Sequence, residues 1–180
     1  MACSGVSQTG IGKRFRFVDV ESLFAEQYER VARLIGRVIR DPGRAEELAV
    51  EVFLKYARSS LPSGSNVEGW LFRTAARMAL DELRAQARRR RYEPLLRLAG
   101  KVATPEEIHN GFQEQARVRA VLGAISLREA ELLVLRSEGV SYEELASALT
   151  LYPASVGTLL SRAQQAFRKE YVKRYGTESY

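Results

Sequence analysis

Apolar residues recur every three or four positions along most of this chain, which is the spacing of an amphipathic helix. The pattern predicts one helix over residues 21–40 and a second over residues 44–60, separated by the helix-ending sequence Asp41-Pro42-Gly43. The predicted inward faces hold Phe24, Tyr28, Val31, Ile35 and Val38 in the first helix, and Ala45, Leu48, Val52, Phe53 and Tyr56 in the second. Both helices would therefore contribute one face to a helical lobe.

A third predicted helix, residues 69–91, follows a loop of turn-forming residues and ends in four consecutive arginines. One face holds Phe72, Ala76, Ala79, Leu83 and Ala87, and another holds Arg73, Arg77, Arg84 and Arg88. At 1.5 Å per residue the helix would extend roughly 32 Å, the length of about nine base pairs of duplex. The cationic face suits a track of phosphates, although solvated surface arginines give the same pattern.

Four further helices are predicted beyond the third. Their ranges are 114–125, 127–139 ended by Gly139, 141–149, and 153–175. Ser141, with Glu144 three residues later, is a capping-box signature, and Pro153 suits the first turn of the last helix.

The last two helices, joined by three residues, have the proportions of a helix-turn-helix, although an ordinary helical hairpin shares them. In the final helix Val156, Leu160, Ala163 and Phe167 would pack inward. The outward face holds Ser155, Gly157, Thr158, Ser161, Arg162 and Arg168. Short hydrogen-bonding residues near the N-terminal end, followed by arginine, suit insertion into a major groove.

These elements predict an all-α fold of two small helical domains joined by a linker, the second containing a helix-turn-helix. Pro94, Gly100 and Pro105 mark the linker, in which one short helix over residues 95–98 is expected. The expected boundaries are a flexible N-terminus over 1–18, a helical domain over 19–92, the linker over 93–105, the helix-turn-helix domain over 106–175 and a tail over 176–180.

Charge favours a polyanionic partner, with nucleic acid the first candidate. Lysine and arginine number 28 against 22 acidic residues, which gives a net charge of +6 and an isoelectric point near 9.7. Cys3 is the single cysteine, which excludes an internal disulfide framework and a cysteine-rich zinc site and fits the reducing cytoplasm. No apolar run approaches the roughly 20 residues that a membrane helix requires, so membrane insertion is not expected.

The sequence does not favour an enzyme. His109 is the single histidine and lies in a linker-like context. No paired metal ligands, phosphate-binding glycine loop or nucleophile with its base can be assembled from the pattern. We therefore expect no catalytic residues, no metal and no cofactor.

Taken in order, these segments resemble the extracytoplasmic-function sigma factors, the compact two-domain subgroup of bacterial sigma factors. "RDPGRAEELAVEVFLKYAR" and "EGWLFRTAARMALDELRAQARRRR" look like parts of the family's region 2, and "TPEE" looks like the end of its linker. "LREAELLVLRSEGVSYEELASALTLYPASVGTLLSRAQQAFRKEY" is similar to region 4. The resemblance extends from Phe24 to Tyr171, and its strength lies in the order and spacing of matches that are weak singly.

The resemblance implies a protein that binds core RNA polymerase, recognises the minus-ten and minus-thirty-five elements of promoter DNA and promotes transcription initiation. It leaves room for an anti-sigma factor as a further partner. The competing hypothesis is a stand-alone helix-turn-helix transcriptional regulator whose N-terminal lobe senses a ligand or dimerises. Such a regulator would bind duplex DNA specifically by itself, whereas a sigma factor generally needs core polymerase.

The resemblance also assigns residues to each role. The polymerase-binding residues it implies are Glu47, Glu51, Phe53 and Lys55. Those for the minus-ten element are Ser63, Ser65, Asn66, Trp70, Arg73, Arg77, Arg84, Arg88, Arg89, Arg90 and Arg91. Those for the minus-thirty-five element are Ser155, Gly157, Thr158, Ser161, Arg162 and Arg168. By chemistry alone, Trp70 also fits a core anchor, and the charges of the second helix fit a solvated face.

The chain departs from the family's pattern at several of these places. Val50 stands where glutamine is frequent, and Arg77 stands where many members carry asparagine, in the floor of the base-holding pocket. Thr150 replaces a common turn glycine, and Gly157 and Leu159 occupy positions that are often basic. The departures bear on which base is captured and on minus-thirty-five contacts, which would be weaker or suited to an unusual sequence.

Overall fold

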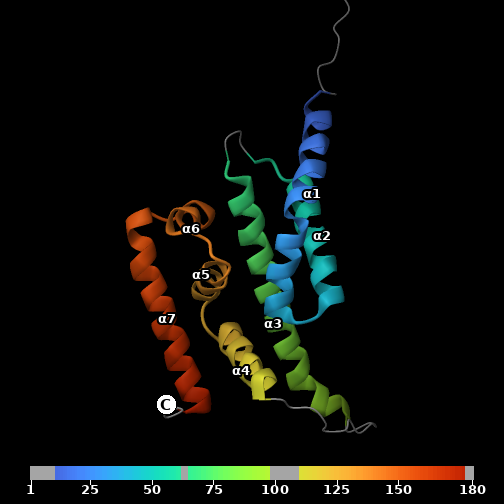
Figure 1. Cartoon of the computed structure of the whole chain (residues 1–180). Coiled ribbons are helices and arrows are strands. Elements are labelled where there is room, and N and C mark those ends of the chain that lie inside the picture. Colours follow the sequence, from blue (N-terminus) through green and yellow to red (C-terminus); the bar gives the residue numbers. More distant parts are fainter. Residues whose placement is uncertain (1–10, 62–64, 98–109, 177–180) are drawn as a thin grey trace, which may run out of the picture.

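In the computed structural model, the described part of the chain is all-helical and divides into two lobes (Figure 1). The structure describes residues 11–61, 65–97 and 110–176, apart from the side chains of residues 11–19, 90–97 and 110–112. The first lobe consists of α1 (Ile11–Ile39), α2 (Pro42–Arg58) and α3 (Val67–Arg97). The second lobe consists of α4 (Asn110–Ala124), α5 (Leu127–Ser137), α6 (Tyr142–Leu149) and α7 (Pro153–Tyr175).

In the first lobe, the turn between α1 and α2 forms where it was predicted. The Asp41 side chain accepts a hydrogen bond from the backbone N–H of Arg44, and Pro42 occupies the first turn of α2. Of the residues predicted to face inward, the buried ones are Val31, Ile35, Val38, Ala45, Leu48, Val52, Phe53, Phe72, Ala76, Ala79 and Leu83. The prediction is wrong for Phe24 and Ala87, which are both exposed.

Two helices extend further than predicted. α1 begins at Ile11, within the stretch expected to be flexible, because no helix-breaking residue separates residues 11–20 from the rest. α3 continues to Arg97 and includes Pro94, so the expected break near Tyr92 is wrong. A proline removes one backbone hydrogen bond but does not always end a helix. Residues 1–10, 98–109 and 177–180 lie outside the described residues, and with them Cys3, His109 and most of the predicted linker.

Capping residues set the helix ends of the second lobe. Ser126 and Ser141 each form a capping box with a glutamate three residues later, of which only the second was predicted. The hydrogen bonds from Ser141 lower the pKa of the Glu144 carboxyl below its ordinary value. Gly139, with φ of +84°, follows α5 as predicted, and Pro153 opens α7.

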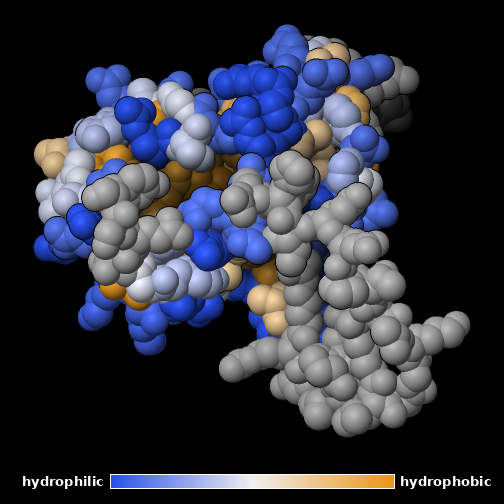
Figure 2. Space-filling model, turned by 60° about the horizontal axis from the view of Figure 1, so that its bottom comes forward, coloured by the Kyte–Doolittle hydropathy of each residue, from blue (hydrophilic) through white to orange (hydrophobic). Residues whose placement is uncertain are grey.

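The two lobes pack against each other through α3. This helix contacts α1 and α2 on one side and α4, α5 and α6 on the other (Figure 1). The buried apolar side chains of both lobes form one continuous cluster. A groove of about 910 Å³ follows the seam between α1 and helices α4 and α5. The described surface on the face shown in Figure 2 is largely hydrophilic, with hydrophobic side chains gathered in a hollow.

Candidate nucleic-acid interface

Three arginines on one face of α3 reach across to the second lobe. Arg73, Arg77 and Arg84 are spaced by four and seven residues, so they share a helix face. Arg77 Nε donates to Oε1 of Glu131 on α5 at 2.8 Å, and Arg73 donates to the carbonyl of Ala148 in α6 at 3.4 Å. Arg73 and Arg84 are half-buried by these contacts, whereas the Arg77 side chain is 48% exposed, so this part of the predicted cationic track is only partly covered. The role of these arginines in binding DNA stays a prediction.

Arg84 caps the end of a helix in the second lobe. Its Nη2 donates to the carbonyl of Ile125 at 3.0 Å, and its Nε donates to the carbonyl of Gly123 at 3.3 Å. These carbonyls lie at the C-terminal end of α4, where the partial negative charge of the helix dipole favours a cation. In this structure Arg84 thus donates hydrogen bonds to carbonyl oxygens at a helix end, whereas its predicted role is to donate them to phosphate oxygens of DNA.

The C-terminal part of α3 presents its arginines to solvent. Arg88 and Arg89 are exposed, and Arg89 forms an ion pair with Glu82 one to two turns earlier. The side chains of Arg90 and Arg91 lie outside the described residues. The predicted phosphate track is therefore open at this end of the helix.

The residues that precede α3 form a helix cap. Asn66 Oδ1 accepts a hydrogen bond from the backbone N–H of Gly69 at 2.7 Å, and its Nδ2 donates to Ser147 Oγ on α6 at 3.0 Å. A Cβ atom at position 69 would lie 2.7 Å from Asn66 Nδ2, so a larger residue there would require the Asn66 side chain to shift from its capping position. The sequence signal was present, since asparagine before an apolar helix is a common N-cap, but the loop interpretation overlooked it.

The other predicted minus-ten residues near this cap are partly enclosed. Trp70 is half-buried, and its ring centre lies 5.9 Å from that of Tyr56. This position supports the core-anchor interpretation without excluding an exposed edge. Ser65 is half-buried, and Ser63 lies outside the described residues.

The outer face of α7 is open. Thr158, Ser161, Arg162 and Arg168 are exposed, as predicted, while Val156, Leu160 and Ala163 are buried behind them. Ser155 and Gly157 are half-buried. The Ser155 hydroxyl donates to the carbonyl of Tyr152 at 2.7 Å, and the position a Cβ would take at Gly157 lies 3.6 Å from the Tyr142 ring.

One exposed aromatic residue at the start of α7 was not among the residues predicted to bind the minus-thirty-five element. Tyr152 is 84% exposed at the N-cap position of the helix. Tyr142, at the start of α6, is also exposed, and the guanidinium of Arg136 lies 5.3 Å from the centre of its ring. An exposed aromatic next to the predicted reading face was visible in the sequence, but helical periodicity does not weigh residues that precede the first turn.

The predicted polymerase-binding face of α2 lies over a buried aromatic residue, as the helical pattern predicted. Phe53 is only 3% exposed and packs against the rings of Phe24 and Tyr28, so it supports this face from beneath and is not part of its surface. Exposed on this helix are Val50 at 41% and Leu54 at 48%, which the sequence reasoning did not select. Their spacing of four residues, away from the core positions, was the available signal.

Charges surround this apolar pair. Glu47 accepts a hydrogen bond of 2.7 Å from Arg44, and that bond raises the pKa of Arg44 above its ordinary value. Glu51 and Lys55 form an exposed ion pair of 3.8 Å. The face therefore combines two apolar side chains with partly paired charges, a composition typical of the rim and core of a protein interface.

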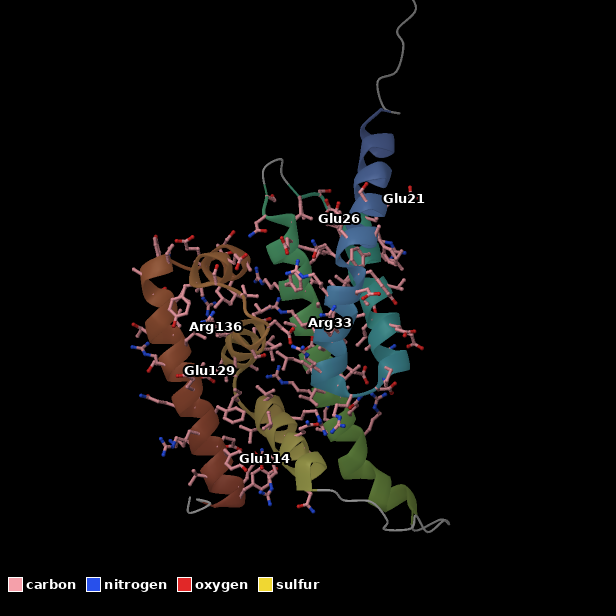
Figure 3. All side chains as sticks on the ribbon, viewed as in Figure 1. Glu21, Glu26, Arg33, Glu114, Glu129 and Arg136 are labelled. Carbon is pink, nitrogen blue, oxygen red and sulfur yellow. The ribbon has the colours of Figure 1, made fainter. Side chains whose placement is uncertain are left out.

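Within the described residues, no group of histidine, cysteine and acidic side chains is arranged to hold a metal ion. The same part of the chain has no helix that is long and apolar enough to cross a membrane. Glu114, labelled in Figure 3, accepts a hydrogen bond of 2.9 Å from the Tyr171 hydroxyl and joins α4 to α7. This hydrogen bond gives Glu114 a structural role.

Comparison with known proteins places these features in a family. Residues 23–89 match the family model of Sigma-70 region 2, which corresponds to most of the first lobe. The chain is 30% identical over 156 residues to the RNA polymerase sigma factor CarQ of Myxococcus xanthus, an alignment that covers 83% of this chain and 85% of CarQ. It is also 30% identical over 153 residues to the ECF RNA polymerase sigma factor SigK of Mycolicibacterium vanbaalenii, with 77% and 73% covered.

Other relatives are longer or more distant. The ECF RNA polymerase sigma factor SigE of Mycolicibacterium smegmatis is 28% identical over 165 residues, which cover 88% of this chain but 63% of that protein. Among solved structures, the chain is similar to the sigma factor RpoE in complex with the anti-sigma factor NepR from Bartonella quintana. That likeness has 20% sequence identity and a TM-score of 0.48, over 84% of this chain and 96% of the other.

Proposed function

Because this chain belongs to the extracytoplasmic-function group of sigma-70 RNA polymerase sigma factors, we propose that it binds core RNA polymerase in the cytoplasm and directs it to particular promoters. It recognises minus-ten and minus-thirty-five elements and promotes strand opening without catalysing a reaction itself. The observation that carries this proposal is the match of residues 23–89 to Sigma-70 region 2.

The exposed faces suggest a division of roles. The face of α2 formed by Val50 and Leu54 with the charges around them binds core polymerase, because exposed apolar side chains on a helix favour a protein partner. The outer face of α7, with Arg162 at its centre, reads the minus-thirty-five element. The arginines of α3 bind the backbone near the minus-ten element, and the residues before α3 contact its bases.

Charge reversal on α2 tests the polymerase contact. Changing both Glu47→Lys and Glu51→Lys shifts the net charge beside Val50 and Leu54 by +4, and we expect affinity for core polymerase to fall about tenfold or more, or ~1.4 kcal/mol. The measurement is fluorescence anisotropy of the labelled full-length chain titrated with core polymerase.

The matched control carries the same charge change on α1. Glu26→Lys with Glu29→Lys alters two exposed residues that helical spacing turns away from α2, and it should bind core polymerase with nearly unchanged affinity. Equal loss in both double variants would show a general charge effect, and full affinity of the α2 variant would remove the face from the interface.

A further inference from the structure

The most exposed large apolar side chain of the described residues lies at the start of α7. Tyr152 is 84% exposed, whereas the other large apolar side chains on the described surface are at most 48% exposed. Single exposed apolar residues are common on proteins and by themselves indicate no partner. Tyr152 differs from such residues because its backbone is fixed and because it lies beside the exposed face of α7.

The backbone of Tyr152 is held in place from both sides of the residue. Pro153 restricts the residue before it to extended conformations, and Tyr152 adopts one, with φ of −73° and ψ of 128°. The Tyr152 carbonyl accepts hydrogen bonds from the Ser155 N–H at 2.9 Å and from the Ser155 hydroxyl at 2.7 Å. The side chain itself makes no capping hydrogen bond. A ring with two rotatable bonds therefore projects from an ordered backbone, and little conformational entropy would be lost on binding.

Short side chains follow Tyr152 on the exposed side of α7. From residue 154 to residue 158, the residues that are not buried are Ala154, Ser155, Gly157 and Thr158. A helix whose side chains are short can approach the floor of a major groove closely, and the longer ring at its start then reaches the base edges. α7 lies on the side of the second lobe away from α1 and α2 (Figure 1), so the first lobe leaves this end of the helix open.

The chemistry of a tyrosine ring matches one group in the major groove. Every base pair presents hydrogen-bond donors or acceptors there, but thymine alone presents an apolar group, its C5-methyl, which apolar side chains contact. Phosphates are contacted chiefly by charged or polar donors, and Arg168 provides such a donor further along α7. The N-terminal residues of a recognition helix lie closest to base edges. The position and the apolar ring of Tyr152 therefore favour a base over the backbone.

We propose that Tyr152 is a specificity-determining residue, whose ring contacts the C5-methyl group of a thymine in the minus-thirty-five element. The proposal rests on the proposed function of α7 and adds a second base contact to it. Tyr152 precedes Arg162 by ten residues, or about 15 Å along a helix. Gly157 and Leu159 provide no charge between them, so the ring is the one long exposed side chain of α7 before Arg162. Contacts this far apart are expected to contribute independently.

Replacing thymine by uracil removes only the C5-methyl group and so isolates the proposed contact. The probe is a promoter fragment that holoenzyme, assembled from core polymerase and the full-length chain, retains from sheared genomic DNA. Each thymine of its upstream element is replaced singly by uracil, and the affinity of holoenzyme is measured. Burying one methyl group is worth about fourfold in affinity, so one replacement should weaken binding of the parent holoenzyme by about that factor.

Three variants assign this effect to the ring. Tyr152→Phe keeps the ring and should show the same fourfold loss with uracil, or about that. Tyr152→Ala should bind the thymine fragment about fourfold or more weakly, and uracil at that position should then cost less than about 1.5-fold. Arg162→Ala, the matched control, should also bind more weakly but should keep the full uracil effect. Because Tyr152 is exposed, circular dichroism melts of Tyr152→Ala should match those of the parent.

The outcomes separate the role of Tyr152 from the function of the chain. An undiminished uracil effect in Tyr152→Ala holoenzyme would overturn the proposal. So would a parent holoenzyme that is indifferent to uracil, and uniform weakening by Tyr152→Ala in that case would place the ring against the DNA backbone. If holoenzyme retains no fragments beyond those that core polymerase retains alone, the proposed function fails, whereas retained fragments with no dependence on residue 152 contradict only the role of Tyr152.

Discussion

Thr150 closes α6 in a conformation that its side chain disfavours. Its φ and ψ are both 55°, in the left-handed region, where a β-branched residue is strained. The bonds around it form a Schellman motif, with the Leu151 N–H donating to the carbonyl of Ala146 at 2.8 Å and the Thr150 N–H to that of Ser147 at 3.4 Å. The turn therefore keeps its geometry without the glycine that usually provides it.

Replacing this residue should stabilise the second lobe. Thr150→Gly removes a left-handed strain of about 1–2 kcal/mol against a loss of backbone entropy, and we expect the free energy of unfolding to rise by about 0.5–1 kcal/mol. Thr158→Gly, the same change in the middle of α7, should lower it by a similar amount. Urea denaturation compares the two, and a decrease in both variants would show that position 150 carries no strain.

Residues that act locally could be predicted from the sequence, and residues that act across the lobes could not. The cap at Asp41 and the capping box at Ser141 rest on neighbours within three positions, so their signals are local. Arg77 and Glu131 are separated by 54 positions, and nothing in helical periodicity pairs them. An arginine on a polar helix face has the same signature whether it meets solvent, DNA or a buried carboxylate.

At the scale of elements, α7 presents the exposed face that we propose reads the minus-thirty-five element. Arg162 lies at the middle of its exposed face, and Arg168 lies nearly two turns further on. The N-terminal half of a recognition helix contacts base edges, while more distant cations tend to contact the backbone. The two arginines are therefore expected to serve different purposes.

The two arginines can be separated by substitution. Arg162→Ala should lose about 1–3 kcal/mol of discrimination between upstream elements and so change promoter preference. Arg168→Ala should weaken binding similarly on all of them and reduce the salt dependence by about one phosphate contact. Holoenzyme assembled with each variant is measured on a panel of upstream-element sequences. Uniform weakening by Arg162→Ala would reassign that residue to the backbone.

Helix boundaries followed the sequence where capping or breaking residues mark them. The predicted and observed ends of α6 agree because Ser141 and the turn before Pro153 define them. α3 extends beyond its predicted end because Pro94 was interpreted as a break, although a proline does not always end a helix. Whether a segment forms a helix was thus easier to predict than where that helix begins and ends.

At the scale of the whole molecule, the two lobes were predictable but their contact was not. Periodicity identifies one apolar face for each helix, and in α3 that face belongs to the first lobe. Leu80 falls between that face and the arginines, a pattern too weak to signal a second interface. Consequently helical periodicity predicts an open cationic face, whereas in the structure Arg73 and Arg77 on this face donate hydrogen bonds to α6 and α5.

The central claim, that the chain acts as a sigma factor, is tested most directly by transcription in vitro. Sheared genomic DNA from the organism that encodes the chain is transcribed by its core polymerase alone and by core polymerase with the full-length chain, and the 5′ ends of the transcripts are mapped by sequencing. We predict start sites that appear only when both proteins are present and that share two upstream elements. The contradicting result is an absence of new start sites while the chain by itself retains specific duplex fragments, as a stand-alone regulator would.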